Sequence, residues 1–275
     1  MKKYILIIFA TLILLSSCTE NTVIEKPRLA ENYYEDWGTI ATNIMIHNNS
    51  MDPIKVALID TGVNLIDKRI VQGSNVIDNS MEYNDELEHG TILCRKLLDI
   101  NKSVNIIPIK IFSNNTTLDV KNLCKGIEKA IELEVDIINI SCGTDIYYKE
   151  LEDIINCAIS QNITIVAAAG NKGAEELLYP ARFKNVISVM ARDINNKDLS
   201  YNNKSRQKQS FSAPGDHILC GSEYYSGSSI ATIYITNFVC ILKQENKTIN
   251  HEEILQWLID HSQYGNDYSY GFVIF

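Results

Sequence analysis

The feature that most constrains the fold is a set of five short, β-branched and almost continuously apolar runs. They span residues 55–60, 105–112, 135–140, 163–169 and 185–190. Such runs are typical of strands that are buried on both faces. Segments with helical periodicity lie between them, at residues 91–100, 118–134 and 148–160. This alternation predicts an α/β fold with a doubly wound, mostly parallel sheet and helices on both faces.

Apolar residues become regular from Trp37 onward, which places the start of the folded domain there. After Ser229, a long apolar segment with the character of a buried helix precedes an amphipathic helix predicted over residues 252–262. A chain of 275 residues can bury a sizeable core. We therefore expect a single folded domain to span residues 37–275.

The first residues, MKKYILIIFATLILLSSC, have the organisation of an export signal. Two lysines precede an apolar run that is short for a membrane span, and small residues lead to Cys18. Residues 15–18 resemble a bacterial lipobox, in which the cysteine is lipidated and becomes the mature N-terminus. We expect a signal peptide at residues 1–17, a short tether at 18–36, and a lipoprotein anchored through Cys18 to the outer face of a bacterial membrane. Plain secretion and an uncleaved signal anchor are the alternatives.

The net charge of −9 argues against a nucleic-acid partner, which requires a basic face that neutralises phosphates. Of the seven cysteines, the six besides Cys18 are widely spaced and form no CxxC pair, so a zinc ribbon or redox motif has no support. Most of them lie in apolar or periodic segments, and we expect them to act as small buried residues. Disulfide pairing stays open because export permits it.

Polar residues directly follow three of the predicted strands. Asp60 closes the run KVALID, Ser141 follows VDIINI, and Asn171 follows ITIVAAAG. In a doubly wound sheet, active sites form outside the carboxyl ends of the strands. These side chains are therefore candidates for chemistry, although an aspartate after a strand is also common in an Asx-turn.

His89, in EHGT, and Ser229, in SGSSIAT, complete a candidate catalytic set. A serine hydroxyl becomes a nucleophile when an imidazole accepts its proton, and a carboxylate fixes the tautomer of that imidazole and stabilises its cation. The chain supplies Asp60, His89 and Ser229 in this order, and the Asn171 amide is a candidate donor to the oxyanion. Taken singly, His89 and Ser229 would also suit helix starts.

Seven sequence blocks, in the same order, resemble those of the subtilisin-like serine proteases (peptidase S8). VALIDTGV is similar to the aspartate motif of that family, HGT to its histidine motif and SGSSIAT to its serine motif. INISCG is similar to the substrate-binding strand, AAAGNKG to the oxyanion-hole segment, YPARFKNVISV to the stretch after it, and FSAPGDHI to the loop before the serine. The resemblance runs from Trp37 to the end of the chain and implies the subtilisin-like fold.

The resemblance also implies roles for individual residues. Ser229 would be the nucleophile of an Asp60–His89–Ser229 triad that acts through an acyl-enzyme intermediate, with Asn171 in the oxyanion hole. An extended peptide would pair with Ser141, Cys142 and Gly143, and the pocket for the residue before the cut would be lined by Ala168, Ala169 and Gly170. Ser226 lies outside the implied site, and Ser228 replaces the usual threonine. Residues 232–234, Thr-Ile-Tyr, stand where the family has Ser-Pro-His, which affects fine geometry rather than the triad.

No cofactor is required by this chemistry. No dense carboxylate loop indicates a calcium site, although calcium could bind through backbone carbonyls. Family members usually carry a folded prosegment, and only residues 18–36 are available for one, so we expect the domain to fold without it. Asp145 is expected to be an exposed loop residue rather than part of the substrate pocket.

Other hydrolase classes fit the chain less well. An aspartic protease needs two Asp-Thr-Gly motifs, an α/β-hydrolase needs the order serine, acid, histidine, and a metalloprotease needs a histidine pair such as HExxH. We therefore predict a serine endopeptidase that acts on a peptide or protein substrate as a processing protease at the bacterial cell surface. Removal of leader peptides from lanthipeptide-type precursors is one role that the resemblance suggests. A general scavenging protease and a catalytically silent lipoprotein scaffold are the alternatives.

Overall fold

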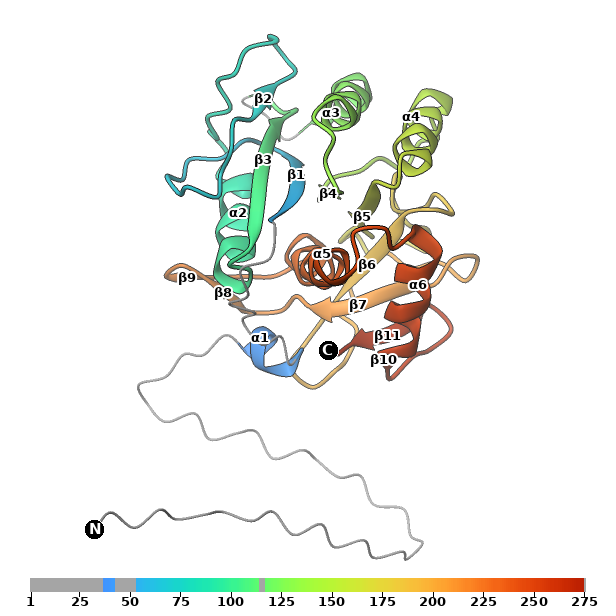
Figure 1. Cartoon of the computed structure of the whole chain (residues 1–275). Coiled ribbons are helices and arrows are strands. Elements are labelled where there is room, and N and C mark those ends of the chain that lie inside the picture. The colour runs from blue at the N-terminus through green and yellow to red at the C-terminus, as the bar shows by residue number, and fades with distance from the viewer. Residues whose placement is uncertain (1–36, 43–52, 114–116, 275) are drawn as a thin grey trace, which may run out of the picture. The chain divides into compact units, whose positions relative to one another are not determined.

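The computed structural model describes residues 37–42, 53–113 and 117–274, which are coloured in Figure 1. The predicted signal peptide, Cys18 and the tether lie outside the described residues. Across the described ranges, no helix is both long and apolar enough to cross a membrane.

A nine-stranded sheet forms the centre of the domain (Figure 1). Its strand order is β10-β11-β7-β6-β5-β4-β1-β3-β2, and every neighbouring pair is parallel except β10 with β11. The strands are β1 (Ile54–Asp60), β2 (Ser74–Asn75), β3 (Val104–Lys110), β4 (Ile137–Ile140), β5 (Thr164–Ala168), β6 (Ile187–Arg192), β7 (Ser210–Pro214), β10 (Ser262–Gln263) and β11 (Ser269–Val273). A separate antiparallel hairpin consists of β8 (Ile218–Cys220) and β9 (Glu223–Tyr225).

The order of the strands reverses beside β1. This strand pairs with β3 on one side, where Asp60 lies opposite Lys110, and with β4 on the other, where Ile59 lies opposite Ile140. The strands after β4 are then added on the β4 side. In α/β sheets a crevice opens at such a reversal, outside the carboxyl ends of the strands. Asp60 and the residues that follow Ile140 therefore border the same crevice.

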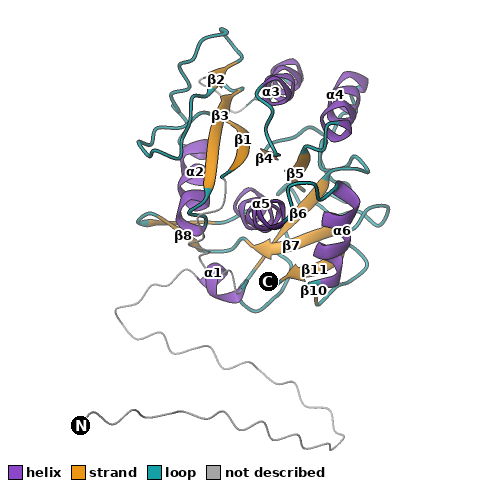
Figure 2. Cartoon of the chain, viewed as in Figure 1, coloured by secondary structure: helices purple, strands orange, loops and turns teal. Residues whose placement is uncertain are grey.

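Helices cover both faces of the sheet (Figure 2). One face packs against α3 (Val120–Glu132) and α4 (Lys149–Ser160), and the other against α2 (His89–Ile100), α5 (Ser228–Glu245) and α6 (His251–Asp260), while the short α1 (Trp37–Ala41) precedes the sheet. Alternate residues of β1 belong to two different hydrophobic clusters: Val56 and Leu58 to one, Ala57 and Ile59 to the other. The continuous apolar runs thus reflect burial on both faces, and the predicted doubly wound α/β fold is confirmed.

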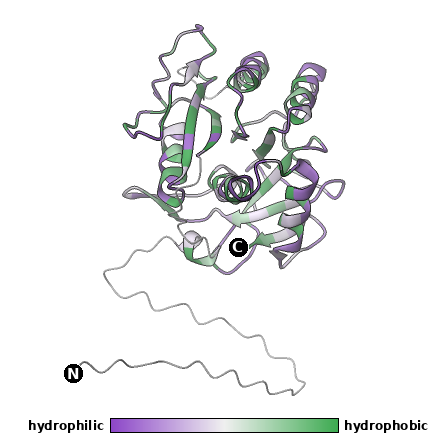
Figure 3. Cartoon of the chain, in the orientation of Figure 1, coloured by the Kyte–Doolittle hydropathy of each residue, from purple (hydrophilic) through white to green (hydrophobic). Residues whose placement is uncertain are grey.

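Helix α5 is buried on all sides, as its continuous apolar sequence predicts. All residues from Ile230 to Lys243 are buried. Figure 3 shows the contrast with α4 and α6, whose outer surfaces are hydrophilic. A hydrogen bond of 2.8 Å from Asn139 Nδ2 to Thr236 Oγ1 ties α5 to the neighbouring β4. Such pairing satisfies polar groups that would otherwise be costly to bury.

Two strands at the C-terminal side of the sheet differ from the prediction. The segment FSAPGDHI, interpreted from the sequence as a loop, begins with four residues of β7. β11 has no counterpart among the predicted strands and pairs with β7. Both strands bury serines that bond to each other, such as Ser212 and Ser269, whose Oγ atoms lie 2.8 Å apart. Because these buried serines hydrogen-bond to one another, β7 and β11 can lie in the interior without a continuous apolar sequence. A search for apolar runs therefore does not find these two strands.

The expectation for the cysteines is only partly correct. Cys94, Cys220 and Cys240 are buried, whereas Cys124 and Cys142 are half-buried and Cys157 is exposed. Cys157 belongs to α4, an amphipathic helix, and lies on the side of that helix that faces solvent. All six cysteines of the described residues are free.

Candidate active site

Asp60 and His89 form a hydrogen-bonded pair at the carboxyl end of β1. His89 Nδ1 lies 2.7 Å from Asp60 Oδ1. The side chain of Asp60 is 1% exposed and that of His89 is 43% exposed. The backbone N–H of Thr61 donates to the same carboxylate oxygen at 2.8 Å. The carboxylate is therefore fixed in the interior, while the imidazole stays accessible.

Two glycines permit this close pairing. Gly62 has a φ of +116°, which favours glycine, and a Cβ there would collide with the backbone oxygen of Tyr83. A Cβ on Gly90 would collide with the backbone oxygen of Gly62 and lie 3.3 Å from Asp60 Oδ1. The turn after β1 and the first turn of α2 thus touch at the level of the backbone, which explains the glycines in the DTG and HGT motifs.

Two carboxylates raise the pKa of His89 above its ordinary value. The largest cause is the negative charge of Asp60; burial opposes it, and the charge of Asp85 adds a smaller increase. A higher pKa means that the neutral imidazole, the form that accepts a proton, is populated at higher pH.

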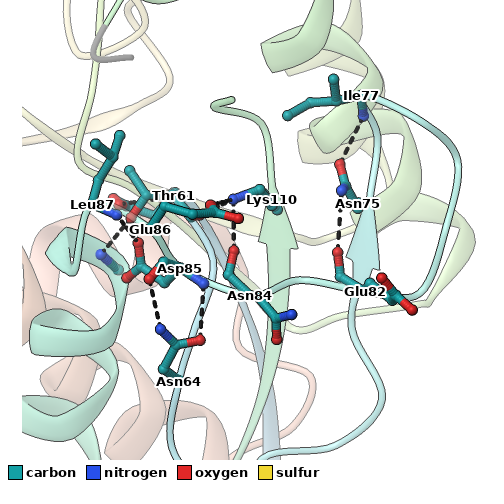
Figure 4. Close-up of polar contacts among 12 residues, drawn as sticks. Thr61, Asn64, Asn75, Ile77, Glu82, Asn84, Asp85, Glu86, Leu87 and Lys110 are labelled. Atoms are coloured by element: carbon teal, nitrogen blue, oxygen red, sulfur yellow. Dashed lines mark hydrogen bonds and ion pairs between the residues drawn. The ribbon is translucent and has the colours of Figure 1, made fainter. Parts of the chain in front are cut away.

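Asp85 also organises the start of α2. Its carboxylate is 3% exposed, and its Oδ2 accepts hydrogen bonds from the N–H and the hydroxyl of Thr91 at 2.8 and 2.7 Å. Asn64 clamps the backbone of Asp85, accepting from its N–H at 2.9 Å and donating to its carbonyl at 2.6 Å (Figure 4). The sequence analysis missed Asp85, because a carboxylate six residues before the residue that donates to it matches no helix-capping spacing.

Lys110, the last residue of β3, holds the loop that leads into His89 (Figure 4). Its Nζ donates to the carbonyls of Thr61 at 3.0 Å and Asn84 at 2.6 Å, and it also pairs with Glu86. These bonds join the turn after β1 to the loop before α2. A charged residue that ends an apolar strand is the sequence signal that could have identified this role.

Ser229 lies in the first turn of α5, which begins at Ser228 with Gly227 as its N-cap. Asn171 Oδ1 accepts a hydrogen bond of 2.9 Å from the N–H of Ser228. A Cβ built on Gly227 would lie 3.1 Å from Asn171 Nδ2, so the amide NH₂ sits beside the start of the helix. The helix dipole and this amide both favour negative charge next to Ser229. The N-cap position belongs to Gly227, which makes no side-chain cap bond, so neither Ser228 nor Ser229 is the N-cap of α5.

The hydroxyl of Ser229 points to β4 rather than to the imidazole. Its Oγ donates to the Ser141 carbonyl at 3.3 Å, and no hydrogen bond links it to His89 within the described residues. Catalytic hydrogen bonds are often long in substrate-free enzymes and tighten only when substrate binds. The structure therefore pairs Asp60 with His89 and places Ser229 against the residue that follows β4, the strand next to β1, without a hydrogen bond between Ser229 and His89.

The segments expected to bind substrate border this crevice. Residues 141–143 continue from β4 and are half-buried, while residues 168–170 comprise the last residue of β5 and the two that follow it, and are buried. Burial raises the pKa of the Cys142 thiol, which keeps it neutral. Asp145 is exposed, as expected.

Leu178 lies between these two segments, a position that the sequence analysis missed. A Cβ built on Gly143 would lie 2.9 Å from Leu178 Cβ, and one built on Gly170 would lie 3.0 Å from Leu178 Cδ1. The N–H of Leu178 donates to the Ala169 carbonyl at 3.1 Å. The leucine side chain thus fills space that small residues on both sides leave open. No local sequence signal reveals this, because the contact depends on how three loops meet.

The parts of SGSSIATIY that depart from the family pattern are accommodated by α5. Thr232 Oγ1 donates to the Ser228 carbonyl at 2.6 Å, and Tyr234 is 0% exposed. Ser226 is exposed, donates to Asp216 at 3.0 Å and accepts from the His217 N–H at 2.9 Å.

A hydrogen-bonded aspartate and histidine at the carboxyl end of a parallel strand, with a serine bonded to the end of the next strand, are features that serine proteases use. Within the ranges that the structure describes, no group of three or more His, Cys, Asp or Glu side chains could hold a metal ion. The sequence matches the Subtilase family (peptidase S8) over residues 52–273, and the chain belongs to this family of serine endopeptidases.

Similar proteins include several bacterial proteases. The chain is 29% identical to the thermostable alkaline protease of Halalkalibacterium halodurans over 84% of this chain and 70% of that protein. It is 31% identical to the minor extracellular protease Epr of Bacillus subtilis over 80% of this chain and 37% of that protein. It is 28% identical to subtilisin Savinase of Lederbergia lenta over 76% of this chain and 83% of that protein. The chain thus spans only part of the longer relatives.

Solved structures share the fold at lower sequence identity. A cold-adapted subtilisin-like serine proteinase has a TM-score of 0.74 and 22% identity over 86% of this chain and 96% of that one. A lanthipeptide protease has a TM-score of 0.71 and 22% identity over 81% of this chain and 86% of that one. The prenylagaramide maturation protease PagA has a TM-score of 0.69 and 23% identity over 81% of this chain and 91% of that one.

Proposed function

We propose that the chain hydrolyses peptide bonds with Ser229 as nucleophile, His89 as general base and acid, Asp60 as the group that orients His89, and Asn171 as an oxyanion donor. The observation that carries this proposal is the 2.7 Å contact between buried Asp60 and accessible His89. It is supported by the hydrogen bond of Ser229 to Ser141, which follows the strand next to β1. Asp60 accepts from Nδ1, so the second ring nitrogen is the one left to take a proton from a hydroxyl.

The reaction then follows from these positions. Ser229 Oγ attacks the carbonyl carbon of the substrate, and its proton passes to His89 while Asp60 stabilises the imidazolium. The oxyanion of the tetrahedral intermediate receives hydrogen bonds from Asn171 Nδ2 and from the Ser229 N–H. His89 returns the proton to the leaving amine, which yields an acyl-enzyme, and water releases the acyl group by the same steps in reverse.

The hydrogen bond that Ser229 makes in the structure suggests how substrate binding starts the reaction. Its Oγ bonds to the carbonyl of Ser141, which begins the segment expected to pair with an extended peptide. A bound peptide competes for the polar groups of that segment. We expect this competition to release the hydroxyl, which then rotates between staggered positions toward His89.

Labelling with a fluorophosphonate tests the nucleophile. We expect the purified full chain to be labelled at Ser229 and to cleave peptides, and the Ser229→Ala variant to do neither. Ser226→Ala is the matched control, because that serine is exposed and bonded to Asp216 instead, and we expect it to retain both activities. A folded parent without labelling or cleavage would favour the silent scaffold.

For the biological role, we propose a dedicated processing protease. Two neighbours in fold are described as a lanthipeptide protease and a maturation protease, which supports a role in processing peptide precursors. Scavenging is the second candidate, supported by relatives described as extracellular and alkaline proteases. Cleavage of a mixed peptide library separates the two: a dedicated enzyme cuts few sequences, and a scavenger cuts broadly.

We further propose that the enzyme acts at the outer face of the membrane, anchored through a lipid on Cys18. Doubly acylated anchors hold stably, whereas a single chain binds only marginally. Metabolic labelling with a fatty-acid analogue, followed by membrane fractionation, tests this anchor. We expect Cys18→Ser to lose the label and leave the membrane fraction while it keeps fluorophosphonate reactivity; a parent that is unlabelled and found in the medium would support plain secretion.

A further inference from the structure

A hollow of about 770 Å³ lies on the flank of the sheet between α4 and α6, two helices that stand at the right of Figure 1. Residues of the loop between β5 and β6 and of the segment before β7 complete its walls. Its volume falls in the range of about 300–1,000 Å³ that is typical of ligand pockets. Asp60, His89, Ser229 and Asn171 are not among the residues that line it. The hollow is therefore separate from the crevice that holds the proposed catalytic residues.

The lining of this hollow has an excess of positive charge, although the chain as a whole is acidic. The whole chain has 25 lysines and arginines against 34 aspartates and glutamates. In the hollow, two carboxylates, Glu152 and Asp267, stand against four cationic side chains, those of Arg182, Lys184, Arg206 and Lys208. A negatively charged ligand is repelled by the net charge of the chain and attracted by this hollow.

Two of these cations are available to a ligand. Lys184 is exposed and has no hydrogen-bond or ion-pair partner among the described residues. Arg206 pairs with Asp267 at 3.5 Å, and the two side chains are 71% and 75% exposed. Exposed ion pairs of this kind contribute little free energy, so a carboxylate of a ligand can replace that of Asp267. Arg182, in contrast, is held by Glu176 at 3.1 Å.

The end of the hollow where α6 begins has the same sign of charge. Lys208 Nζ donates to three backbone carbonyls, and no carboxylate of the described residues lies within ion-pair distance of it. Burial lowers the pKa of His251, and the positive charge of Lys208 lowers it further. Glu252 and Lys243 have smaller and opposite effects on this pKa. The surroundings of His251 therefore favour negative rather than positive charge.

The other end of the hollow meets the segment expected to bind substrate. Tyr147 and Tyr179 line this end, and their rings form an edge-to-face pair with centroids 5.8 Å apart. Tyr147 is 48% exposed. Tyr179 pairs with Thr144 through two backbone hydrogen bonds of 2.8 and 2.9 Å, directly after residues 141–143. The two tyrosines thus form an aromatic rim between residues 141–143 and the hollow.

The position of Ser229 gives the direction of a bound peptide. Its Oγ bonds to the carbonyl of Ser141, so the bond to be cut lies at the Ser141 end of the segment 141–143. Substrate residues before the cut pair with this segment, and those farther from the cut lie nearer to Gly143 and to the aromatic rim. The part of the substrate farther upstream is therefore the part that reaches the hollow. This step rests on the proposed function, whereas the shape and charge of the hollow do not.

We propose that the hollow is an exosite for an acidic segment of the peptide substrate, several residues upstream of the cut. Lys184 and Arg206 bind the carboxylates of that segment, and the peptide crosses the rim formed by Tyr147 and Tyr179. The substrate class is then a precursor whose leader carries aspartates or glutamates upstream of the cleavage site. The exosite binds a part of the substrate that does not react, so it lowers KM rather than raising kcat.

The test uses peptides that share one cleavable core, taken from the library cleavage, and differ in their charges. An upstream extension of about eight residues spans roughly 26 Å when extended. The first peptide has three glutamates in this extension, the second has glutamines in their place, and the third has the three glutamates after the cut. At low ionic strength, we expect upstream glutamates to raise kcat/KM by about 5-fold or more over the glutamines, mainly through KM, and salt to reduce this gain.

Charge variants locate the effect. The double variant Lys184→Gln, Arg206→Gln is expected to lose the preference, so that the ratio of kcat/KM for the glutamate peptide over the glutamine peptide falls towards one. The matched control is Lys55→Gln, Lys102→Gln, which removes the same charge from two exposed lysines near the amino ends of β1 and β3. We expect this control to keep the preference. An equal loss in both double variants, or an equal gain from glutamates after the cut, would reduce the effect to net charge and overturn the exosite.

Binding to the full chain with Ser229→Ala separates the exosite from the chemistry. Fluorescence anisotropy of the labelled extension alone needs no cleavage. We expect the glutamate extension to bind about 5-fold more tightly than the glutamine extension, and Lys184→Gln with Arg206→Gln to abolish the difference. A chain that shows this binding but cleaves no peptide would refute the proposed chemistry and support the exosite. A chain that cleaves the glutamate and glutamine peptides equally well and binds both extensions equally would support the chemistry and overturn the exosite.

Discussion

At the scale of single residues, the proposed role of His89 as general base makes the pH range of activity depend on its contact with Asp60 and on the nearby charge of Asp85. Both carboxylates raise the pKa of His89, and only the neutral imidazole accepts the serine proton. The acid limb of kcat/KM is therefore expected to lie above the ordinary histidine value of about 6.5. The ion pair between protonated His89 and Asp60 stabilises the fold below the ordinary histidine pKa. This contribution is lost as the pH rises through the raised pKa of His89. The enzyme is thus most active where the pair no longer stabilises the fold.

A pH profile of kcat/KM, with the rate of fluorophosphonate labelling as a second readout, checks this. Asp60→Asn is the informative variant: we expect its acid limb to shift to lower pH and kcat to fall by about 10⁴-fold, because the imidazole loses the partner that fixes its tautomer. A parent whose acid limb lies at or below the ordinary histidine value would contradict the assignment.

Leu178 should limit the size of the residue before the cut. Its side chain lies within 3.0 Å of where a Cβ on Gly143 or Gly170 would be. Leu178→Ala is expected to shift the ratio of kcat/KM for large over small residues at that position by roughly 10-fold or more in favour of large ones. Leu151→Ala is the control, because it removes a buried leucine, 0% exposed, from the cluster on the α3 and α4 side of the sheet. An unchanged ratio in Leu178→Ala would place the pocket elsewhere.

At the scale of elements, Asp85 couples the stability of α2 to the chemistry of its first residue. Asp85→Asn replaces a buried carboxylate that accepts from Thr91 and raises the pKa of His89. We expect a loss of about 1–2 kcal/mol in urea unfolding and an acid limb at lower pH than in the parent. Asp78→Asn serves as control, since its carboxylate accepts from the Ser80 N–H at 2.9 Å at an exposed turn. A variant that is destabilised but keeps the parental pH profile would show that Asp85 acts on the helix alone.

At the scale of the whole molecule, the sequence predicted what depends on local pattern. β1, β3, β4, β5 and β6 were found because both of their faces are apolar, and the order of Asp60, His89 and Ser229 was visible in glycine-bearing motifs. β7 and β11 were missed because their buried serines bond across strands. Asp85 and Leu178 were missed for a related reason: their roles arise from loops that meet only in the folded chain.

The two hydrophobic clusters share one sheet, so we expect the domain to unfold as a single unit. Both tryptophans, Trp37 and Trp257, pack against the cluster on the α2 and α5 side. Ile127 belongs to the opposite cluster and is 0% exposed. In a Ser229→Ala background, Ile127→Ala is expected to cost about 2–5 kcal/mol, and tryptophan fluorescence should report the same lowered Tm as circular dichroism at 222 nm. Alternate residues of β1 face the two clusters, so losing one cluster leaves the strand without half of its packing. If Ile127→Ala keeps the parental Tm by tryptophan fluorescence but has a lower Tm by circular dichroism, the two faces of the sheet unfold separately.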